Sequence, residues 1–253
     1  MQSRSKLIVG SIAGVILLGI VFFNSLVFLL GSIISYGIND AITSYPNELR
    51  QEYARRGNTY LSYVDTPTCI KEGIISVEDK RFFTHPGFDV IAAFRAAFES
   101  MANDHIDHGG STITQQLARR ILHEKRNHAN IFEEIASQLK ILRYTLAIEQ
   151  HFTKEKILEL YLNNIYYGRG ARGITQASRI YFNKNVQDLS LGQCVFLTGL
   201  PQAPTIFGND PLGQAASERY AHVLRTMDRN HYLTSDQARA LREKGLAGLD
   251  ILP

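Results

Sequence analysis

Two short stretches of the chain carry residue types that do chemistry in proteins. The first runs from Glu78 to Gly87 and reads EDKRFFTHPG, so adjacent carboxylates precede a basic pair, two aromatics, a histidine and a Pro-Gly turn. Apolar surroundings disfavour the charged form of a carboxylate, which makes it a better general base near neutral pH. A solvated charged turn is the alternative interpretation of the same residues.

The second stretch runs from His108 to Arg120 and reads HGGSTITQQLARR. Its two glycines leave the backbone open to close approach by a ligand, while its hydroxyls and amides offer neutral hydrogen bonds. Arg119 and Arg120 follow the amides by one helical turn and are suited to bind a phosphate. A glycine turn in front of an ordinary helix also explains this pattern, so each stretch alone is ambiguous.

Together these stretches resemble the motifs of glycosyltransferase family 51, the peptidoglycan glycosyltransferases. Such enzymes occur alone or as the N-terminal module of class A penicillin-binding proteins. The resemblance rests on ED-x-x-F-x-x-H-x-G at 78–87 and GGSTITQQL at 109–117, and it continues through 154–182 and 189–211. No Ser-Asp-Asn or Lys-Thr-Gly motif of a transpeptidase follows, so the resemblance is to a monofunctional biosynthetic enzyme.

The resemblance implies that the protein polymerises lipid II into glycan strands by inverting glycosyl transfer, with release of undecaprenyl pyrophosphate. Glu78 would act as the general base on the 4-hydroxyl of the acceptor sugar. The residues implied to bind substrate or to line the cleft are Asp79, Phe82, His85, Gly110, Ser111, Thr112, Gln115, Gln116, Arg119, Arg120 and Lys140. Because the leaving group is an anion, cations near the second motif are expected to stabilise its developing charge.

The third motif of the family, Arg-Lys-x-x-Glu, is not intact in this chain. Counting back from Glu159 places its Glu on Ile141, whereas counting forward from Gln116 places it on Ile135. The two counts disagree by six residues, which indicates a short insertion. Glu134 is the nearest carboxylate and lies on roughly the same helical face as Ile141, so it is the candidate for a second catalytic carboxylate.

Lys140 or Arg143 is the candidate to replace the cation of the third motif. The alternative is that Glu133 and Glu134 are solvated surface charges. Gln193 is a second departure, because the family usually has Glu at this position of its fifth motif. Two functions therefore stay open: an active glycosyltransferase with a rearranged third motif, or a catalytically impaired protein of the same fold that binds lipid II or assists cell-wall assembly. A lytic transglycosylase is a third, suggested by fold similarity alone.

Helix-length apolar patterns dominate the chain from Asp40 onward, and strand-like alternation is sparse. The predicted helices span 90–102, 114–122, 131–150, 154–166, 174–182, 215–229 and 235–244, with Asp89, Thr153 and Thr234 or Ser235 as N-caps, and residues 190–200 are an apolar segment. An irregular stretch is predicted between Pro201 and Pro211. We therefore expect a mainly α fold, and the family resemblance adds that the domain is lysozyme-like with two lobes.

The N-terminal part of the chain differs from the rest. Residues 7–35 contain no ionisable side chain, and a helix of about 20 apolar residues is enough to cross a bilayer. Arg4 and Lys6 precede this run, so the positive-inside rule places the N-terminus in the cytoplasm. We expect a cytoplasmic segment (1–6), a transmembrane helix (7–35), a membrane-proximal linker (36–59) and a glycosyltransferase domain (60–253) on the outer face of the cytoplasmic membrane.

The charge of the remaining chain excludes bulk binding to nucleic acid. The formal net charge is +3, but Arg4 and Lys6 are the only charges before Asp40, so the rest is nearly neutral. The expected partners are lipid II, the nascent glycan strand, the membrane and other cell-wall synthesis or division proteins. No cofactor is required and no metal site is predicted, although a divalent cation, Mg or Mn, is compatible with the pyrophosphate. Cys69 and Cys194 are able to pair in an oxidising compartment.

Overall fold

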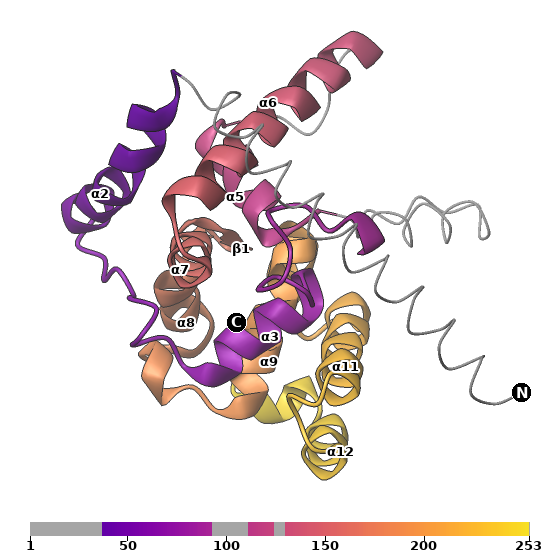
Figure 1. Ribbon diagram of the computed structural model, residues 1–253. Coiled ribbons are helices and arrows are strands. Elements are labelled where there is room, and N and C mark those ends of the chain that lie inside the picture. The colour runs from indigo at the N-terminus through magenta and orange to yellow at the C-terminus, as the bar shows by residue number, and fades with distance from the viewer. Residues whose placement is uncertain (1–36, 93–110, 124–129, 253) are drawn as a thin grey trace, which may run out of the picture.

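The computed structural model describes residues 37–92, 111–123 and 130–252, which form a mainly helical fold (Figure 1). The predicted mainly α class is therefore confirmed. The predicted transmembrane segment at 7–35, the predicted helix beyond residue 92, and Gly110 lie outside the described residues. Within the described part of the chain, no helix combines the length and the apolar character needed to cross a membrane.

The elements follow one another with short connections. The helices are α2 (Asn39–Arg55), α3 (Thr68–Glu78), α5 (Ile113–Ile121), α6 (Ile131–His151), α7 (Lys154–Asn164), α8 (Ile174–Phe182), α9 (Leu191–Gly199), α10 (Pro204–Asn209), α11 (Gln214–Arg229) and α12 (Ser235–Lys244). Single 3-10 turns lie at Val186–Asp188, Leu200–Gln202 and Leu246–Leu249. Two short strands, β1 (Tyr166–Gly168) and β2 (Ala171–Arg172), pair antiparallel with Tyr166 opposite Arg172.

The predicted helices that lie within the described residues are found close to their predicted bounds. Thr153 accepts a hydrogen bond from the Lys156 N–H, and Thr234 accepts one from the Gln237 N–H, so both cap their helices as expected. The Asp89 carboxylate accepts the Ala92 N–H at 2.7 Å, as expected for an N-cap. The helix predicted over 154–166 ends earlier, at Asn164, because the chain then turns into β1.

Three helices were not predicted, and α9 was predicted only as an apolar segment. Residues 39–55 of the predicted linker form α2, α3 covers the residues up to Glu78, and α10 lies in the predicted irregular stretch. α2 contains Pro46, a residue that removes a helical hydrogen bond and disfavours a helix interior. Its buried residues Ile42, Leu49 and Tyr53 join the core, and α2 packs against α6. Tertiary burial therefore outweighs the local preference.

The core around the first motif is built from α3, α9 and α11, which pack against one another (Figure 1). α9 is buried along almost its whole length, from Gly192 to Gly199. Gly73 lets α3 approach α9 closely, because a Cβ at this position would lie 2.7 Å from the Thr198 Cγ2 atom. The helix that ends at Glu78 is therefore held in contact with the most buried helix of the described fold.

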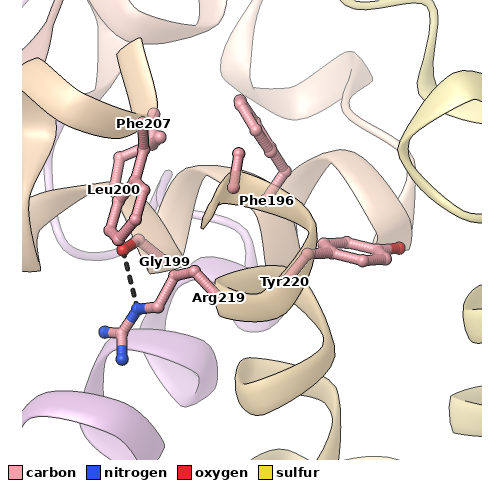
Figure 2. A pocket seen from close by; sticks show the side chains of 7 residues that line it. Phe196, Gly199, Leu200, Phe207, Arg219 and Tyr220 are labelled. Carbon is pink, nitrogen blue, oxygen red and sulfur yellow. Dashed lines mark hydrogen bonds between the residues drawn. The ribbon is translucent and has the colours of Figure 1, made fainter. Parts of the chain in front are cut away.

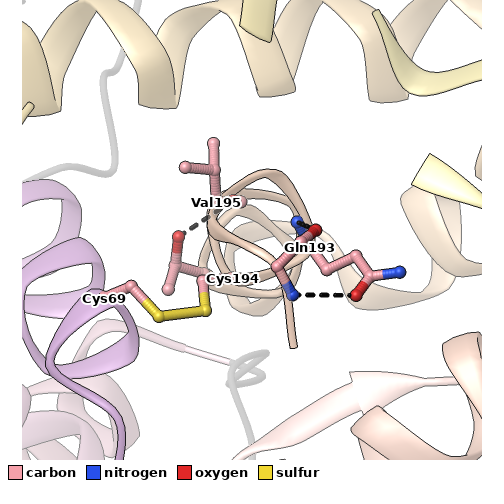
Figure 3. The surroundings of a disulfide bond; sticks show 6 residues. Cys69, Gln193, Cys194 and Val195 are labelled. Atoms are coloured by element: carbon pink, nitrogen blue, oxygen red, sulfur yellow. Dashed lines mark hydrogen bonds between the residues drawn. A yellow bond between two sulfur atoms is a disulfide. The ribbon is translucent and has the colours of Figure 1, made fainter. Parts of the chain in front are cut away.

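A disulfide joins Cys69 at the start of α3 to Cys194 in α9 (Figure 3). The two Cα atoms are 5.8 Å apart, which is within the usual range for a disulfide, and the bridge closes a loop of 125 residues. The sequence left this pairing open, and the structure decides it. The bridge ties one end of α3 to the core, while the other end carries Glu78.

We predict that replacing both cysteines, Cys69→Ser with Cys194→Ser, destabilises the protein. Closing a long loop restricts the unfolded chain and typically stabilises a protein by about 2–4 kcal/mol, which corresponds to roughly 4–16 °C in Tm for a chain of this size. Thermal unfolding with and without reductant measures the effect. Reductant should lower the Tm of the wild-type protein but not that of the double variant, and equal Tm values for the two oxidised proteins would contradict the prediction.

The segment between α2 and α3 is fastened to α7 by buried polar groups. The Asn163 side chain accepts the Leu61 N–H at 3.0 Å and donates to the Leu61 carbonyl oxygen at 2.8 Å. The Glu159 carboxylate accepts the Tyr60 hydroxyl at 2.8 Å and the Tyr63 N–H at 2.9 Å. Burial opposes the charge of Glu159, but these hydrogen bonds and that of Lys156 lower its pKa. The chain that leads into α3 is thereby fixed.

Candidate functional site

Glu78 is the last residue of α3, and its side chain is mostly buried, with 11% exposed. The Gln116 amide on α5 donates its Nε2–H to Glu78 Oε2 at 2.8 Å. On the other side, the Arg219 guanidinium on α11 lies 3.6 Å from Glu78 Oε1. Three helices that are far apart in sequence therefore converge on this carboxylate, with a hydrogen-bond donor on one oxygen and a positive charge beside the other.

Tyr161 orients the amide that contacts Glu78. Its hydroxyl donates to Gln116 Oε1 at 3.2 Å, so the Nε2 end of the amide faces the carboxylate. Burial, followed by the charge of Glu78, raises the pKa of Tyr161 well above its ordinary value, so the hydroxyl keeps its proton. Tyr161, Gln116 and Glu78 thus form a chain of hydrogen bonds with a defined direction.

Asp79 connects the first motif to the second. Its carboxylate lies 2.8 and 3.0 Å from His85 Nε2, and its Oδ2 accepts the Ile113 N–H at the start of α5 at 3.0 Å. The Gly87 N–H donates to His85 Nδ1 at 3.1 Å, so the ring proton lies on Nε2 and points to Asp79. These contacts set the position of α5 relative to the end of α3.

Thr112 and Gln115, which were predicted to line the cleft, form the capping box of α5. Thr112 Oγ1 accepts the Gln115 N–H, Gln115 Oε1 accepts the Thr112 N–H, and the Thr112 hydroxyl donates to the Gly87 carbonyl oxygen at 2.7 Å. These side chains start the helix and tie it to the first motif. Ser111, which precedes the cap, is exposed.

Phe82, an aromatic residue of the first motif, also supports the structure of the site. Phe82 is fully buried, and the Lys154 ammonium lies 4.7 Å from the centre of its ring. Lys154 donates to Glu149 at 2.7 Å, and the Thr114 hydroxyl donates to the same Glu149 oxygen at 2.5 Å. Glu149, near the end of α6, therefore joins α5 to α7 beneath the first motif. The sequence did not single out either Glu149 or Lys154.

Arg119 and Arg120 lie in the last turn of α5 and are partly buried, where positive charges are favourable at a helix C-terminus. The charge of Arg120 acts on the buried Tyr161 hydroxyl, so Arg120 lies near the Tyr161–Gln116 contact. Among the residues that the structure describes, no cluster of His, Cys, Asp and Glu is arranged to hold a metal ion. The described part of the site offers carboxylates, amides and guanidinium groups as its chemistry.

Residues 46–228 match the model of a protein family described as transglycosylase. The chain belongs to the transglycosylase family. The resemblance to the glycosyltransferase module of class A penicillin-binding proteins is thereby confirmed.

The similar proteins are much longer than this chain. Penicillin-binding protein 1A of Rickettsia felis is 35% identical over 204 residues, which cover 78% of this chain and 25% of the relative. Penicillin-binding protein 1A of Neisseria gonorrhoeae is 35% identical over 211 residues, which cover 83% of this chain and 25% of the relative. A crystal structure of penicillin-binding protein 1A from Haemophilus influenzae is 31% identical, with a TM-score of 0.35 over 37% of this chain and 14% of that chain. The chain spans about a quarter of the length of these curated relatives.

The residues proposed for the third transglycosylase motif lie on the first half of α6. Glu134 is in the first turn and accepts a hydrogen bond from Gln138 at 2.6 Å, and Lys140 is exposed. Ile141, where one count placed the Glu of the motif, is only 2% exposed and belongs to the core. Fifteen residues separate Glu134 from Glu149, which is about 22 Å along a regular helix. Figure 1 shows the first half of α6 extending beyond α5 and α7.

Gln193, where the family usually has Glu, is buried and acts as a cap. Its Oε1 accepts the Ser190 N–H at 3.0 Å, and its Nε2 donates to the Leu249 carbonyl oxygen at 2.8 Å. Figure 3 shows Gln193 on α9 beside the disulfide. A Glu here would keep the cap but lose the donor to Leu249. This departure from the family is therefore explained by a hydrogen bond to the C-terminal segment.

The sequence did not identify Arg219. It lies on α11 between Ala216 and Tyr220, which are both buried, and its own side chain is 10% exposed. Figure 2 shows it beside a small pocket lined by Phe196, Gly199, Leu200, Phe207, Ala216 and Tyr220. An arginine on the buried face of an amphipathic helix was the available signal, because such a charge needs a partner.

We predict that Asp79→Ala destabilises the protein, because it leaves the His85 Nε2–H and the Ile113 N–H without their acceptor. Each unpaired buried donor costs about 1–3 kcal/mol, so the free energy of unfolding should fall by roughly 2–6 kcal/mol. Urea unfolding measures this loss. Lys80→Ala, at the exposed neighbouring position, is the control and should change stability by less than about 0.5 kcal/mol. Equal stability of both variants would contradict the role given to Asp79.

Proposed function

We propose that this chain polymerises lipid II into peptidoglycan glycan strands by inverting glycosyl transfer, with release of undecaprenyl pyrophosphate. The observation that carries the proposal is the buried Glu78 carboxylate, held between Gln116 and Arg219 at the end of α3. Membership of the transglycosylase family supports the reaction type. The same carboxylate lies in the motif whose glutamate acts as general base in glycosyltransferase family 51.

In this proposal, Glu78 accepts the proton of the acceptor 4-hydroxyl as its oxygen attacks the anomeric carbon of the growing chain. The bond to the pyrophosphate breaks, and the bonding electrons leave with the pyrophosphate. Arg119 and Arg120, at the C-terminal end of α5, would stabilise the charge that develops on this leaving group. Gln116 and its neighbour Tyr161 hold the base in place. No step of the proposal requires a metal ion.

We further propose that the protein is a single-pass protein of the cytoplasmic membrane with this domain on the outer face. The uncharged segment at 7–35 and the preceding Arg4 and Lys6 support that topology. The Cys69–Cys194 disulfide supports an oxidising location, because disulfides rarely persist in a reducing cytoplasm. Lipid II, carried by the same membrane, would then lie within reach of the site.

The second candidate function is binding of lipid II or assistance to cell-wall assembly without turnover. Ile141 favours it, because a buried apolar residue stands where one alignment of the third motif requires Glu. Without that Glu, the site would have a base but a weaker means of stabilising the transition state. The two candidates differ in one observable, the appearance of glycan polymer.

We predict that the full-length protein, purified in detergent and supplied with lipid II, makes glycan strands and that Glu78→Gln abolishes this activity. Loss of a positioned general base lowers a rate by roughly 100-fold to 10,000-fold. Gel analysis of the strands and release of undecaprenyl pyrophosphate measure the rate. Glu72→Gln, a partly exposed carboxylate on the same helix, is the control and should retain activity.

The possible outcomes of this assay distinguish the candidate functions. Undiminished synthesis by Glu78→Gln would remove the general-base role from Glu78. Binding of lipid II by the wild-type protein without any polymer would favour the assembly function. Cleavage of finished glycan in the absence of lipid II would indicate a lytic transglycosylase instead.

The proposal for a second carboxylate is tested in the same assay. If Glu134 assists the reaction, Glu134→Gln should lower the rate by about tenfold or more while lipid II binding stays near the wild-type value. Glu133→Gln is the matched control, since Glu133 is the exposed neighbour in the same helical turn. A wild-type rate for both variants would make Glu134 a surface residue.

A further inference from the structure

Arg219 occupies an unusual place for a charged residue. It lies on the face of α11 that packs into the core, and burial lowers the pKa of its guanidinium, an effect that the charge of Glu78 partly offsets. A buried charge destabilises a fold unless it is paired and hydrogen-bonded. Arg219 has two such contacts, one to Glu78 and one to the backbone of α9.

The contact with α9 orients the guanidinium. Arg219 Nε donates to the Gly199 carbonyl oxygen at 3.0 Å, as the dashed line in Figure 2 shows. Gly199 is the last residue of α9, and carbonyl oxygens at a helix C-terminus carry partial negative charge. The position also needs a small residue, because a Cβ there would lie 3.3 Å from Arg219 Cγ and 3.2 Å from Val223 Cγ2. α9 thus directs the other end of the guanidinium toward Glu78.

The contact with Glu78 is an ion pair. Its distance of 3.6 Å between Arg219 Nη2 and Glu78 Oε1 is longer than a hydrogen bond. The guanidinium of Arg219 therefore places a positive charge beside this oxygen without binding it tightly. Gln116 donates to Oε2 from the opposite side, so the two groups together fix the orientation of the carboxylate.

Other charged and titratable groups face this site from the neighbouring elements. They include Arg219 of α11, which faces Glu78, and Tyr161 of α7 and Tyr167 of β1, on which the charge of Glu78 acts. The charges of Arg120 of α5 and of Asp79 also act on Tyr161. Burial raises the pKa values of Tyr161 and Tyr167 well above the ordinary value, so both stay neutral over the range in which a carboxylate titrates. Arg219 forms an ion pair with Glu78.

We propose that Arg219 is a positioning residue that keeps Glu78 ionised and aimed as the general base, with α9 as its support through Gly199. This inference rests on the proposed function and assigns a role to a residue outside the first three family motifs. In the free enzyme, the guanidinium favours the deprotonated form of Glu78. Glu78 is therefore able to accept a proton at a lower pH than it could without Arg219. Its removal should therefore move the acidic limb of the pH–rate profile to higher pH.

The test compares Arg219→Gln, Arg219→Lys and wild type as full-length proteins in the lipid II assay across pH. Arg219→Gln should shift the acidic limb upward by up to about 1 pH unit, so that the rate falls by up to about tenfold at pH values below the limb and recovers as pH rises. Arg219→Lys keeps the charge but loses the fork that reaches both Gly199 and Glu78. It should keep the wild-type limb with a lower kcat.

Arg225→Gln is the matched control, because Arg225 lies on the exposed face of the same helix and should keep both rate and profile. A lower rate for Arg219→Gln with an unmoved limb would overturn the inference and leave Arg219 a purely structural residue. If Arg219→Gln does not fold, Arg219→Lys decides: a wild-type kcat would overturn the positioning role. Absence of glycan synthesis by the wild-type protein would defeat the proposed function itself. Loss of synthesis in Glu78→Gln together with an unmoved Arg219→Gln profile would defeat this inference alone.

Discussion

Asp79 lies between the end of α3 and the start of α5, and its carboxylate receives a donor from each side. His85 reaches it from the turn after α3, and the Ile113 N–H reaches it from the first turn of α5. The rest of the site depends on this contact, because Glu78 is the adjacent residue and Gln116 lies one turn into α5. A shift of α5 relative to α3 would separate Gln116 from Glu78.

Several residues of the family motifs in this chain build the structure around Glu78. Thr112, Gln115 and Phe82, which the family resemblance assigns to the cleft, start a helix or fill the core. Glu78 and Gln116 form the hydrogen-bonded pair at which we place the proton transfer. In the proposed reaction, the supporting residues matter as much as Glu78 itself. A general base acts only within hydrogen-bond reach of its substrate, so its position must be fixed.

The charges of Glu78 and Asp79 are each balanced by a nearby partner. Glu78 meets the guanidinium of Arg219, and Asp79 meets the proton on His85 Nε2, so each carboxylate has its own partner. Burial strengthens such contacts and makes an unpaired group costly. The disulfide at Cys69 and the close approach of α3 to α9 hold the same helix from its other end. α3 is thus fixed at both ends, which suits a residue that must keep its orientation.

The sequence by itself determined the mainly α class, most helix bounds and N-caps such as that of Thr153, and it singled out Glu78 as the candidate base. These features depend on local spacing or on short motifs, and local hydrogen bonds reproduce them in the structure. Only the tertiary structure decided that α2 forms despite Pro46, that Cys69 meets a distant cysteine, and that Arg219 faces Glu78. Those contacts join residues far apart in sequence, so no local pattern encodes them, and they exist only because burial of the core brings the helices together.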